Sequence, residues 1–191
     1  KQLGVDQPDF GHLTDDFAHL EHEPIALDTY LQPRVEPEIA FVLRKPLTGP
    51  GVTLTQAIDA VDYVLPALEV VDSRVADWKI TLADTIADNA SSCGWILGEQ
   101  RVPIADLDTG DIDAVLHRNG EIVAKGNSSA VLGHPLNAVS WLANKVSSFG
   151  VRLRQGDVIL PWTATRAIDI ASGDHFVAEF LGLGSVTLDF A

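Results

Sequence analysis

The sequence is poor in cysteine, contains no methionine and has no long apolar run. Its one cysteine, Cys93, cannot form an intrachain disulfide. A disulfide-stabilised scaffold is therefore excluded, and a reducing, cytoplasmic setting is expected. No stretch approaches the roughly 20 apolar residues of a membrane-spanning helix, so no membrane contact is expected.

Positive charge is also scarce. Lysine and arginine total 13 residues against 27 aspartates and glutamates, and the formal net charge is −14. A surface of this sign repels nucleic acid, and no cluster of basic residues offers a local exception. If so acidic a protein binds an anionic substrate, it needs a cation at the site.

The remaining composition suits one globular domain. Hydrophobic residues make up 46% and charged residues 21% of the chain, and 191 residues are enough for a substantial core. We therefore interpret residues 1–191 as a single domain.

Periodic patterns predict an α+β domain dominated by antiparallel sheet. Residues 1–30 are expected to be loop with short elements, and residues 72–92 to be polar and irregular. Asn119–Gly120 predicts a type I′ hairpin turn. Strands are expected at residues 35–43, 63–71, 111–118, 121–125, 157–160, 165–170, 175–181 and 185–190.

Two helices are expected. Thr53 and Gln56 resemble a capping box at the start of the first. The second should run from Pro135 to Phe149, and His134 just before it is interpreted as structural. Its apolar stripe is formed by Leu136, Val139, Leu142, Val146 and Phe149.

Three carboxylates stand out on the predicted strands. Glu36 and Glu38 project from one face of the first, roughly 6.6 Å apart along the chain, and Glu69 lies near the end of the second. If they converged at ~4 Å, each pair would repel by roughly 4 kcal/mol at an effective dielectric of 20. Such a cluster needs protonation or a cation, and oxygen-only ligands suit Mg²⁺ or Mn²⁺.

Spacing alone leaves a plain alternative open for these carboxylates. Glu36 and Glu38 could form a solvated strand face, while Glu69 pairs with Arg34 or Arg74.

Several separate motifs resemble the 2-hydroxypenta-2,4-dienoate hydratases of the fumarylacetoacetate hydrolase superfamily. Together they cover nearly the whole chain, which makes the resemblance far more specific than any single motif. The matching segments are residues 2–11 (QLGVDQPDFG), 31–40 (LQPRVEPEIA), 64–74 (VLPALEVVDSR), 84–91 (DTIADNAS) and 133–138 (GHPLNA).

The resemblance implies that residues 1–191 form a single catalytic domain, a mixed, mainly antiparallel β-roll with few flanking helices. It implies that Glu36, Glu38 and Glu69 hold a divalent metal, Mg²⁺ or Mn²⁺, and that Asp9 and Ser91 have roles in the substrate pocket. It also implies a homo-oligomer in aromatic meta-cleavage or steroid degradation, and leaves open an association with another pathway enzyme.

The implied reaction adds water to 2-hydroxypenta-2,4-dienoate, through its 2-oxo-3-enoate tautomer, to give 4-hydroxy-2-oxopentanoate. A metal would act as Lewis acid, and Asp9 is the candidate to take the proton of the water. Ser91 would donate a hydrogen bond to the substrate carboxylate. As alternatives, Asp9 is a turn residue after Pro8 and Ser91 a helix or turn cap.

The chain departs from the family pattern in two places. The family carries a lysine in a Gly-x-Lys-Val-Gly-Leu-Thr segment shortly before the Leu-Gly-Val-Asp stretch. That lysine and an N-terminal helical segment are therefore expected to lie outside residues 1–191. In addition, residues 161–166 (PWTATR) replace a Thr-Gly-rich loop. The family pattern therefore does not predict which residues form the far wall of the pocket.

Two other functions remain open at this point. A decarboxylase of the 4-oxalocrotonate type would share the metal and the enolate chemistry. A catalytically weak subunit that partners another pathway enzyme is the third hypothesis.

Overall fold

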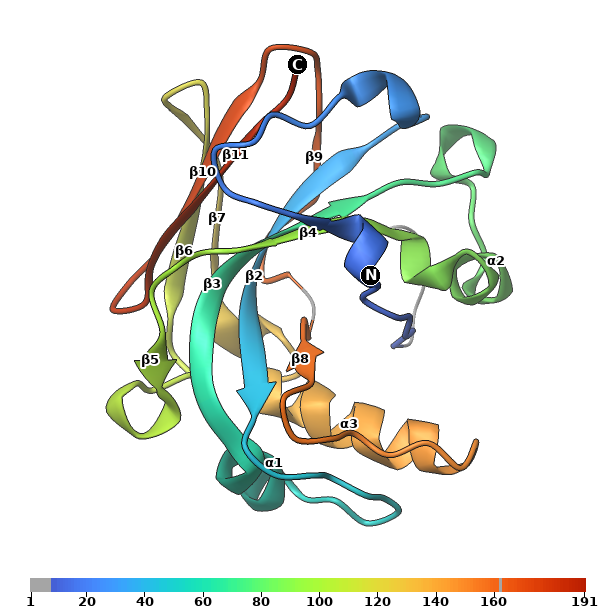
Figure 1. Ribbon diagram of the computed structural model, residues 1–191, viewed down its shortest axis with the longest axis vertical. Helices are drawn as coiled ribbons and strands as arrows, with labels where there is room; N and C mark the ends of the chain where they lie inside the picture. The colour runs from blue at the N-terminus through green and yellow to red at the C-terminus, as the bar shows by residue number, and fades with distance from the viewer. Residues whose placement is uncertain (1–7, 162) are drawn as a thin grey trace.

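The computed structural model describes residues 8–161 and 163–191, and it forms two β-sheets and three α-helices over these ranges (Figure 1). The first sheet has the strand order β1 (Ala18–His19), β4 (Ser92–Leu97), β3 (Val61–Val71), β2 (Arg34–Leu43) and β8 (Val158–Ile159). Two short strands extend it: β5 (Val102–Pro103) pairs with β3, and β9 (Ile168–Asp169) pairs with β2.

The second sheet has the strand order β11 (Gly184–Asp189), β10 (His175–Phe180), β6 (Asp113–Arg118) and β7 (Glu121–Asn127). Among the named strands, β1 and β4 are parallel and all other pairs are antiparallel. The predicted mixed, mainly antiparallel fold is confirmed.

β2 and β3 form the centre of the first sheet and are buried on both faces. One face of β2, with Val35, Ile39 and Phe41, packs into the main core between the sheets. On the other face, Ala40 and Val42 join a small apolar cluster. Strand residues alternate between faces, so Glu36 and Glu38 lie on the side of Ala40 and Val42. This side faces away from the second sheet.

Two helices begin as the sequence predicts. Helix α1 (Leu54–Ala60) starts with the Thr53–Gln56 capping box, and α3 (Pro135–Ser147) follows His134, whose ring Nδ1 accepts a hydrogen bond from the Leu136 amide at 3.2 Å. The structural interpretation of His134 is confirmed. The predicted end of α3 is wrong, because the helix stops at Ser147 and Phe149 lies beyond it with 63% of its surface exposed.

The prediction that residues 72–92 are irregular is only partly correct. Helix α2 (Leu82–Ala87) lies within this range and begins with a capping box between Thr81 and Asp84. Six residues are too few for a clear apolar period, which explains why the sequence pattern did not show it. Short 3-10 turns complete the chain: Asp15–Phe17, Leu27–Thr29, Ala76–Trp78, Asn89–Ser91, Ile104–Asp106 and Ser128–Ala130.

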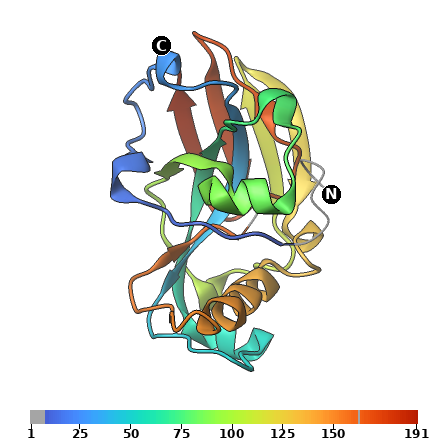
Figure 2. The ribbon, with the colours of Figure 1, turned by 90° about the vertical axis from the view of Figure 1, so that its right-hand side faces the viewer.

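The predicted hairpin is present, with positive φ at both Asn119 and Gly120 as a type I′ turn requires. The strands expected at residues 157–160 and 165–170 shrink to the two-residue β8 and β9. In the described residues, no helix is both long and apolar enough to cross a membrane. Figure 2 shows α2 and the N-terminal segment, residues 8–17, together on one side of the first sheet, above α3.

Candidate metal centre and cavity

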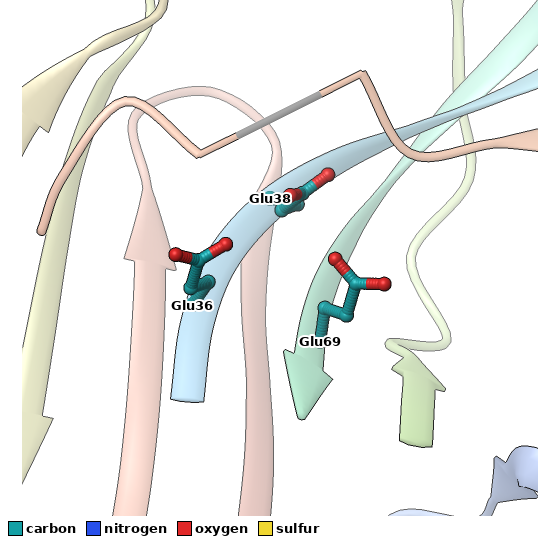
Figure 3. A group of neighbouring side chains, drawn as sticks. All are labelled: Glu36, Glu38 and Glu69. Atoms are coloured by element: carbon teal, nitrogen blue, oxygen red, sulfur yellow. The ribbon is translucent and has the colours of Figure 1, made fainter. Parts of the chain in front are cut away.

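The three glutamates predicted from the sequence meet at one point on the first sheet. Glu36 of β2 is the register partner of Glu69 of β3, so the two stand directly opposite each other. Glu38 is two residues further along β2 and projects from the same face. Each glutamate offers a carboxylate oxygen, and these oxygens lie within 4.8 Å of one another (Figure 3).

Burial makes this cluster electrostatically costly. Glu36 is 6% exposed and Glu38 is 2% exposed. Burial, with the charges of Glu69 and Asp9 as further causes, raises the pKa of Glu36 to about 8, although Arg34 acts in the opposite direction. Like charges directly opposite each other destabilise a β-ladder. The protein alone therefore favours protonated carboxyls here.

Glu69 shows the same behaviour. Burial raises its pKa to about 7, and the charge of Asp9 adds to the effect. The Ser92 hydroxyl beside it works in the opposite direction, although Ser92 makes no hydrogen bond of ordinary geometry within the described chain. A divalent cation would remove the repulsion, and three carboxylate oxygens are ligands that Mg²⁺ and Mn²⁺ prefer. The donor set fits such an ion.

The alternative pairing of Glu69 with an arginine is wrong. Arg34 donates to Asp169 at 2.8 Å, and Arg74 lies 3.1 Å from Asp88. The alternative of a solvated strand face is also wrong, since Glu36 and Glu38 are buried.

The glutamates line a cavity of about 800 Å³. Its polar part includes the three glutamates, Asp9, Thr85 and Ser92. Its apolar walls include Phe10, Val71, Ile80, Leu142, Val158 and Leu160. With a divalent cation held by the glutamates, this division would match a small molecule that has one anionic end and an apolar remainder.

Asp9 lies in the cavity wall, and a chain of hydroxyls reaches it. Thr85 Oγ1 donates to Asp9 Oδ2 at 2.9 Å, and Thr85 Oγ1 lies 3.3 Å from Ser91 Oγ. Asp9 is also close enough to Glu36 and Glu69 for its charge to raise the pKa of both carboxyls. Asp9 therefore belongs to the same polar region as the glutamates.

Ser91 is 1% exposed, and its Oγ lies 3.3 Å from Thr85 Oγ1. Thr85 and Ser92 are the hydroxyl residues that line the described cavity. The role of Ser91 in substrate binding stays a prediction. Sequence analysis missed Thr85, although it is part of the motif at residues 84–91, and it missed Ser92, which directly follows that motif.

The segment that carries Asp9 is held in place by Asn89. The Asn89 side chain accepts from the His12 amide at 2.7 Å and donates to the His12 carbonyl at 2.9 Å. A Cβ on Gly11 would come within 2.3 Å of the Asn89 carbonyl oxygen, so only glycine allows this approach. Trp95 Nε1 adds a bond of 2.9 Å to the Thr14 carbonyl.

The turn that presents Asn89 is strained. Asn89, Ala90 and Ser91 have φ values of 55°, 57° and 63°, a conformation that non-glycine residues rarely adopt. Each such residue costs on the order of 1 kcal/mol, and strain of this kind persists only where the surroundings hold it. The bonds from Asn89 and Ser91 to the N-terminal segment and to Thr85 are part of that restraint.

Residues 161–166 are only partly described. Trp162 lies outside the described residues, so the structure describes this loop only at residue 161 and residues 163–166. Gly126 of β7 packs against the loop, because a Cβ there would meet the Ala164 carbonyl oxygen at 2.3 Å.

Comparison with known proteins finds a family model and close relatives. The model described as the fumarylacetoacetate hydrolase C-terminal domain matches residues 8–191. A protein named TodF product hydratase from Pseudomonas putida F1 is 46% identical over 191 residues, covering 100% of this chain and 71% of that protein. A 2-keto-4-pentenoate hydratase from Burkholderia vietnamiensis is 44% identical, covering 100% of this chain and 72% of that protein.

Among solved structures, 4-oxalocrotonate decarboxylase from Pseudomonas putida G7, complexed with magnesium and adipate, superposes with a TM-score of 0.95. It is 37% identical, and the match covers 99% of this chain and 72% of that chain.

Proposed function

Since this chain belongs to the fumarylacetoacetate hydrolase family and is an enzyme of the hydro-lyase type, we propose that it hydrates 2-hydroxypenta-2,4-dienoate to 4-hydroxy-2-oxopentanoate. The observation that carries the proposal is the cluster of the buried Glu36 and Glu38 with the half-buried Glu69, beside Asp9 in one cavity. Relatives named for the hydration of this type of substrate support it over the full length of the chain.

We assign Glu36, Glu38 and Glu69 as the residues that would hold Mg²⁺ or Mn²⁺. When bound, the ion would supply Lewis-acid stabilisation of negative charge on the substrate oxygens. Without it, three carboxylates would repel the substrate's own carboxylate. The fit of the oxygen donor set and the magnesium complex of the related decarboxylase support this assignment.

Asp9 is our candidate for the proton transfers of the hydration step. The dienol first ketonises by moving its hydroxyl proton to C5, which gives the 2-oxo-3-enoate. Water then adds at C4 while Asp9 accepts its proton and C3 receives one, so that the atoms of water are all retained. Thr85 donates to the Asp9 carboxylate and so orients it. The role of Ser91 as a contact to the substrate carboxylate stays a prediction.

The test of this function is direct. Purified protein with Mg²⁺ or Mn²⁺ is mixed with 2-hydroxypenta-2,4-dienoate, and the loss of its ultraviolet absorbance is followed. The formation of 4-hydroxy-2-oxopentanoate is checked by NMR. Absorbance loss without this product, or equal rates with and without metal, would contradict the proposal.

A decarboxylase remains the second candidate, because the related 4-oxalocrotonate decarboxylase superposes closely. The charge of the cavity argues for the hydratase. Its described lining contains no lysine or arginine, so a second substrate carboxylate would find no permanently charged cationic partner there, and His12 is the one basic side chain of that lining.

We therefore expect the enzyme to prefer a monocarboxylate. The kcat/KM for 2-hydroxypenta-2,4-dienoate should exceed that for 4-oxalocrotonate by at least about 10-fold, since an unpaired charge in a cavity costs more than 1 kcal/mol. Ultraviolet assays on both substrates and a carbon dioxide electrode measure the two reactions. Faster carbon dioxide release than hydration would favour the decarboxylase.

Asn89→Ala should lower both stability and turnover. The change removes the two hydrogen bonds to His12 that hold the Asp9 segment. We expect a loss of about 1–3 kcal/mol in unfolding free energy and a fall in kcat of about 10-fold to 100-fold, since a small misplacement of a reacting group is costly. Urea unfolding and steady-state kinetics measure these effects.

The structure offers a matched control for this variant. Asn144 also bridges both backbone groups of a distant residue, Val52, at 2.8 and 2.9 Å, and it does not line the described cavity. Asn144→Ala should lower stability by a similar amount and leave kcat unchanged. If both variants lowered kcat equally, Asn89 would not act through the position of Asp9.

Four expectations from the sequence remain proposals: the homo-oligomer, the association with another pathway enzyme, the cytoplasmic location and the degradation pathway.

A further inference from the structure

Ser92 places a buried, unpaired hydroxyl in the cavity. It is 4% exposed, and its Oγ lies near the Glu69 carboxyl but makes no hydrogen bond of ordinary geometry in the part of the chain that the structure describes. A buried hydroxyl without a partner costs about 1–3 kcal/mol, so native structures rarely keep one without a reason. Because Ser92 lines the cavity, a bound molecule can provide the missing partner.

A β-bulge brings Ser92 to this position. In the β3–β4 ladder, Glu69 pairs with Trp95 and Val70 with Gly94, but Val71 pairs with Ser92. In a regular ladder Val71 would pair with Cys93, and the thiol would then face the cavity together with Trp95. The extra residue turns Cys93 away and places Ser92 opposite Val71 on the cavity side instead. Bulges that redirect a side chain are common beside active sites.

The surroundings of Ser92 define what it can bind. It lies beside Glu69 at the polar end of the cavity, where Asp9 and Thr85 also contribute oxygen atoms. When they are ionised, the carboxylates in this region accept hydrogen bonds but cannot donate them. A serine hydroxyl can donate a hydrogen bond to an anionic oxygen of a ligand. The apolar walls at the other end of the cavity suit the carbon chain of that ligand.

We propose that the Ser92 hydroxyl donates a hydrogen bond to the carboxylate or 2-oxo oxygen of the substrate, and so binds the head of a 2-oxo acid beside the glutamate cluster. The proposal rests on the proposed function for the identity of the substrate. It adds a substrate-binding residue that differs from the predicted Ser91.

The experiment uses 2-oxopentanoate, a saturated 2-oxo acid that cannot be hydrated. Isothermal titration first measures the Kd of Mg²⁺ alone, and then the Kd of 2-oxopentanoate in saturating Mg²⁺. Ser92→Ala should raise the Kd of 2-oxopentanoate by about 10-fold, the loss expected for one hydrogen bond to a charged group, and leave the Kd of Mg²⁺ within about 2-fold. Ser92→Thr, which keeps the hydroxyl, should restore much of the affinity.

Cys93→Ala is the matched control. It truncates the neighbouring buried side chain on the same strand, which does not line the described cavity, and both Kd values should stay unchanged. If Ser92→Ala fails to fold, Ser92→Cys gives the same comparison, because a thiol has a similar shape and is a weak donor.

Two outcomes would overturn the inference. An unchanged Kd for 2-oxopentanoate would show that the hydroxyl makes no contact with the head group. A weaker Kd for Mg²⁺ that accounts for the whole loss would show that Ser92 only orients Glu69. By contrast, wild-type protein that binds 2-oxopentanoate through Ser92 but hydrates no dienoate would contradict the proposed function and leave the binding role intact.

Discussion

Glu69→Ala should abolish metal-dependent activity. The variant keeps Glu36 and Glu38 on β2 but removes the carboxylate that stands opposite Glu36 on β3. Loss of a residue that only supports a metal ligand typically costs 10-fold to 100-fold, so loss of a ligand should weaken Mg²⁺ binding by more than about 100-fold. With the charge on the substrate oxygens no longer stabilised, kcat/KM should fall by about 1000-fold or more.

Titration calorimetry with Mg²⁺ and the ultraviolet assay measure both effects. Glu179→Ala is the control, because Glu179 is an exposed glutamate on β10 that pairs with His117 and does not line the described cavity. It should bind Mg²⁺ and turn over substrate like the wild type. Wild-type Mg²⁺ affinity in Glu69→Ala would remove Glu69 from the metal site.

The metal-free protein should lose stability as the pH rises from about 6.5 to about 8. In the folded protein the pKa of Glu36 is raised to about 8 and that of Glu69 to about 7, from an ordinary value of 4.5 for both. At a pH between the ordinary value of 4.5 and these raised pKa values, the two glutamates hold protons in the folded state that they have released in the unfolded state. Raising the pH therefore favours unfolding, by an amount on the order of 2 kcal/mol over this window.

Other titrating groups define this pH window. Burial lowers the pKa of His19 and of His134 below 6.5, so these two groups stabilise the fold increasingly as the pH rises to that value. Burial acts to raise the pKa of Asp174, but its hydrogen bonds and the charge of Arg118 lower this pKa below its ordinary value. Asp174 therefore affects stability only at acidic pH. Above pH 6.5 the glutamate cluster is the dominant source of pH dependence among these groups.

Urea unfolding in EDTA and in saturating Mg²⁺ measures the effect at four pH values across the window. With Mg²⁺ the decline should disappear or reverse, because the ion binds the ionised carboxylates of the folded state. Glu36→Gln should flatten the decline in EDTA, because it removes one titrating group and the charge facing Glu69. A wild-type decline that is identical with and without Mg²⁺ would contradict a cation site at this cluster.

The sequence by itself determined much of the framework of the site. A strand has a period of two residues, so the spacing of Glu36 and Glu38 sufficed to place both on one face. The capping residue Thr53, the Asn119–Gly120 turn and the start of α3 depend on local hydrogen bonds and backbone sterics, and the structure confirms all three. The separate motifs led to the family, which the comparisons show.

Tertiary structure decided which groups share the cavity. The register of β2 against β3 sets Glu36 opposite Glu69, although 33 positions separate them in the sequence, and no local pattern encodes that register. The bulge in β4 exchanges Cys93 for Ser92 on the cavity side, and the strained turn at Asn89–Ser91 directs Ser91 toward Thr85. These features depend on long-range pairing and packing. A shift of one residue in the pairing of a strand reverses the face of every side chain that follows, and the local sequence does not reveal such a shift.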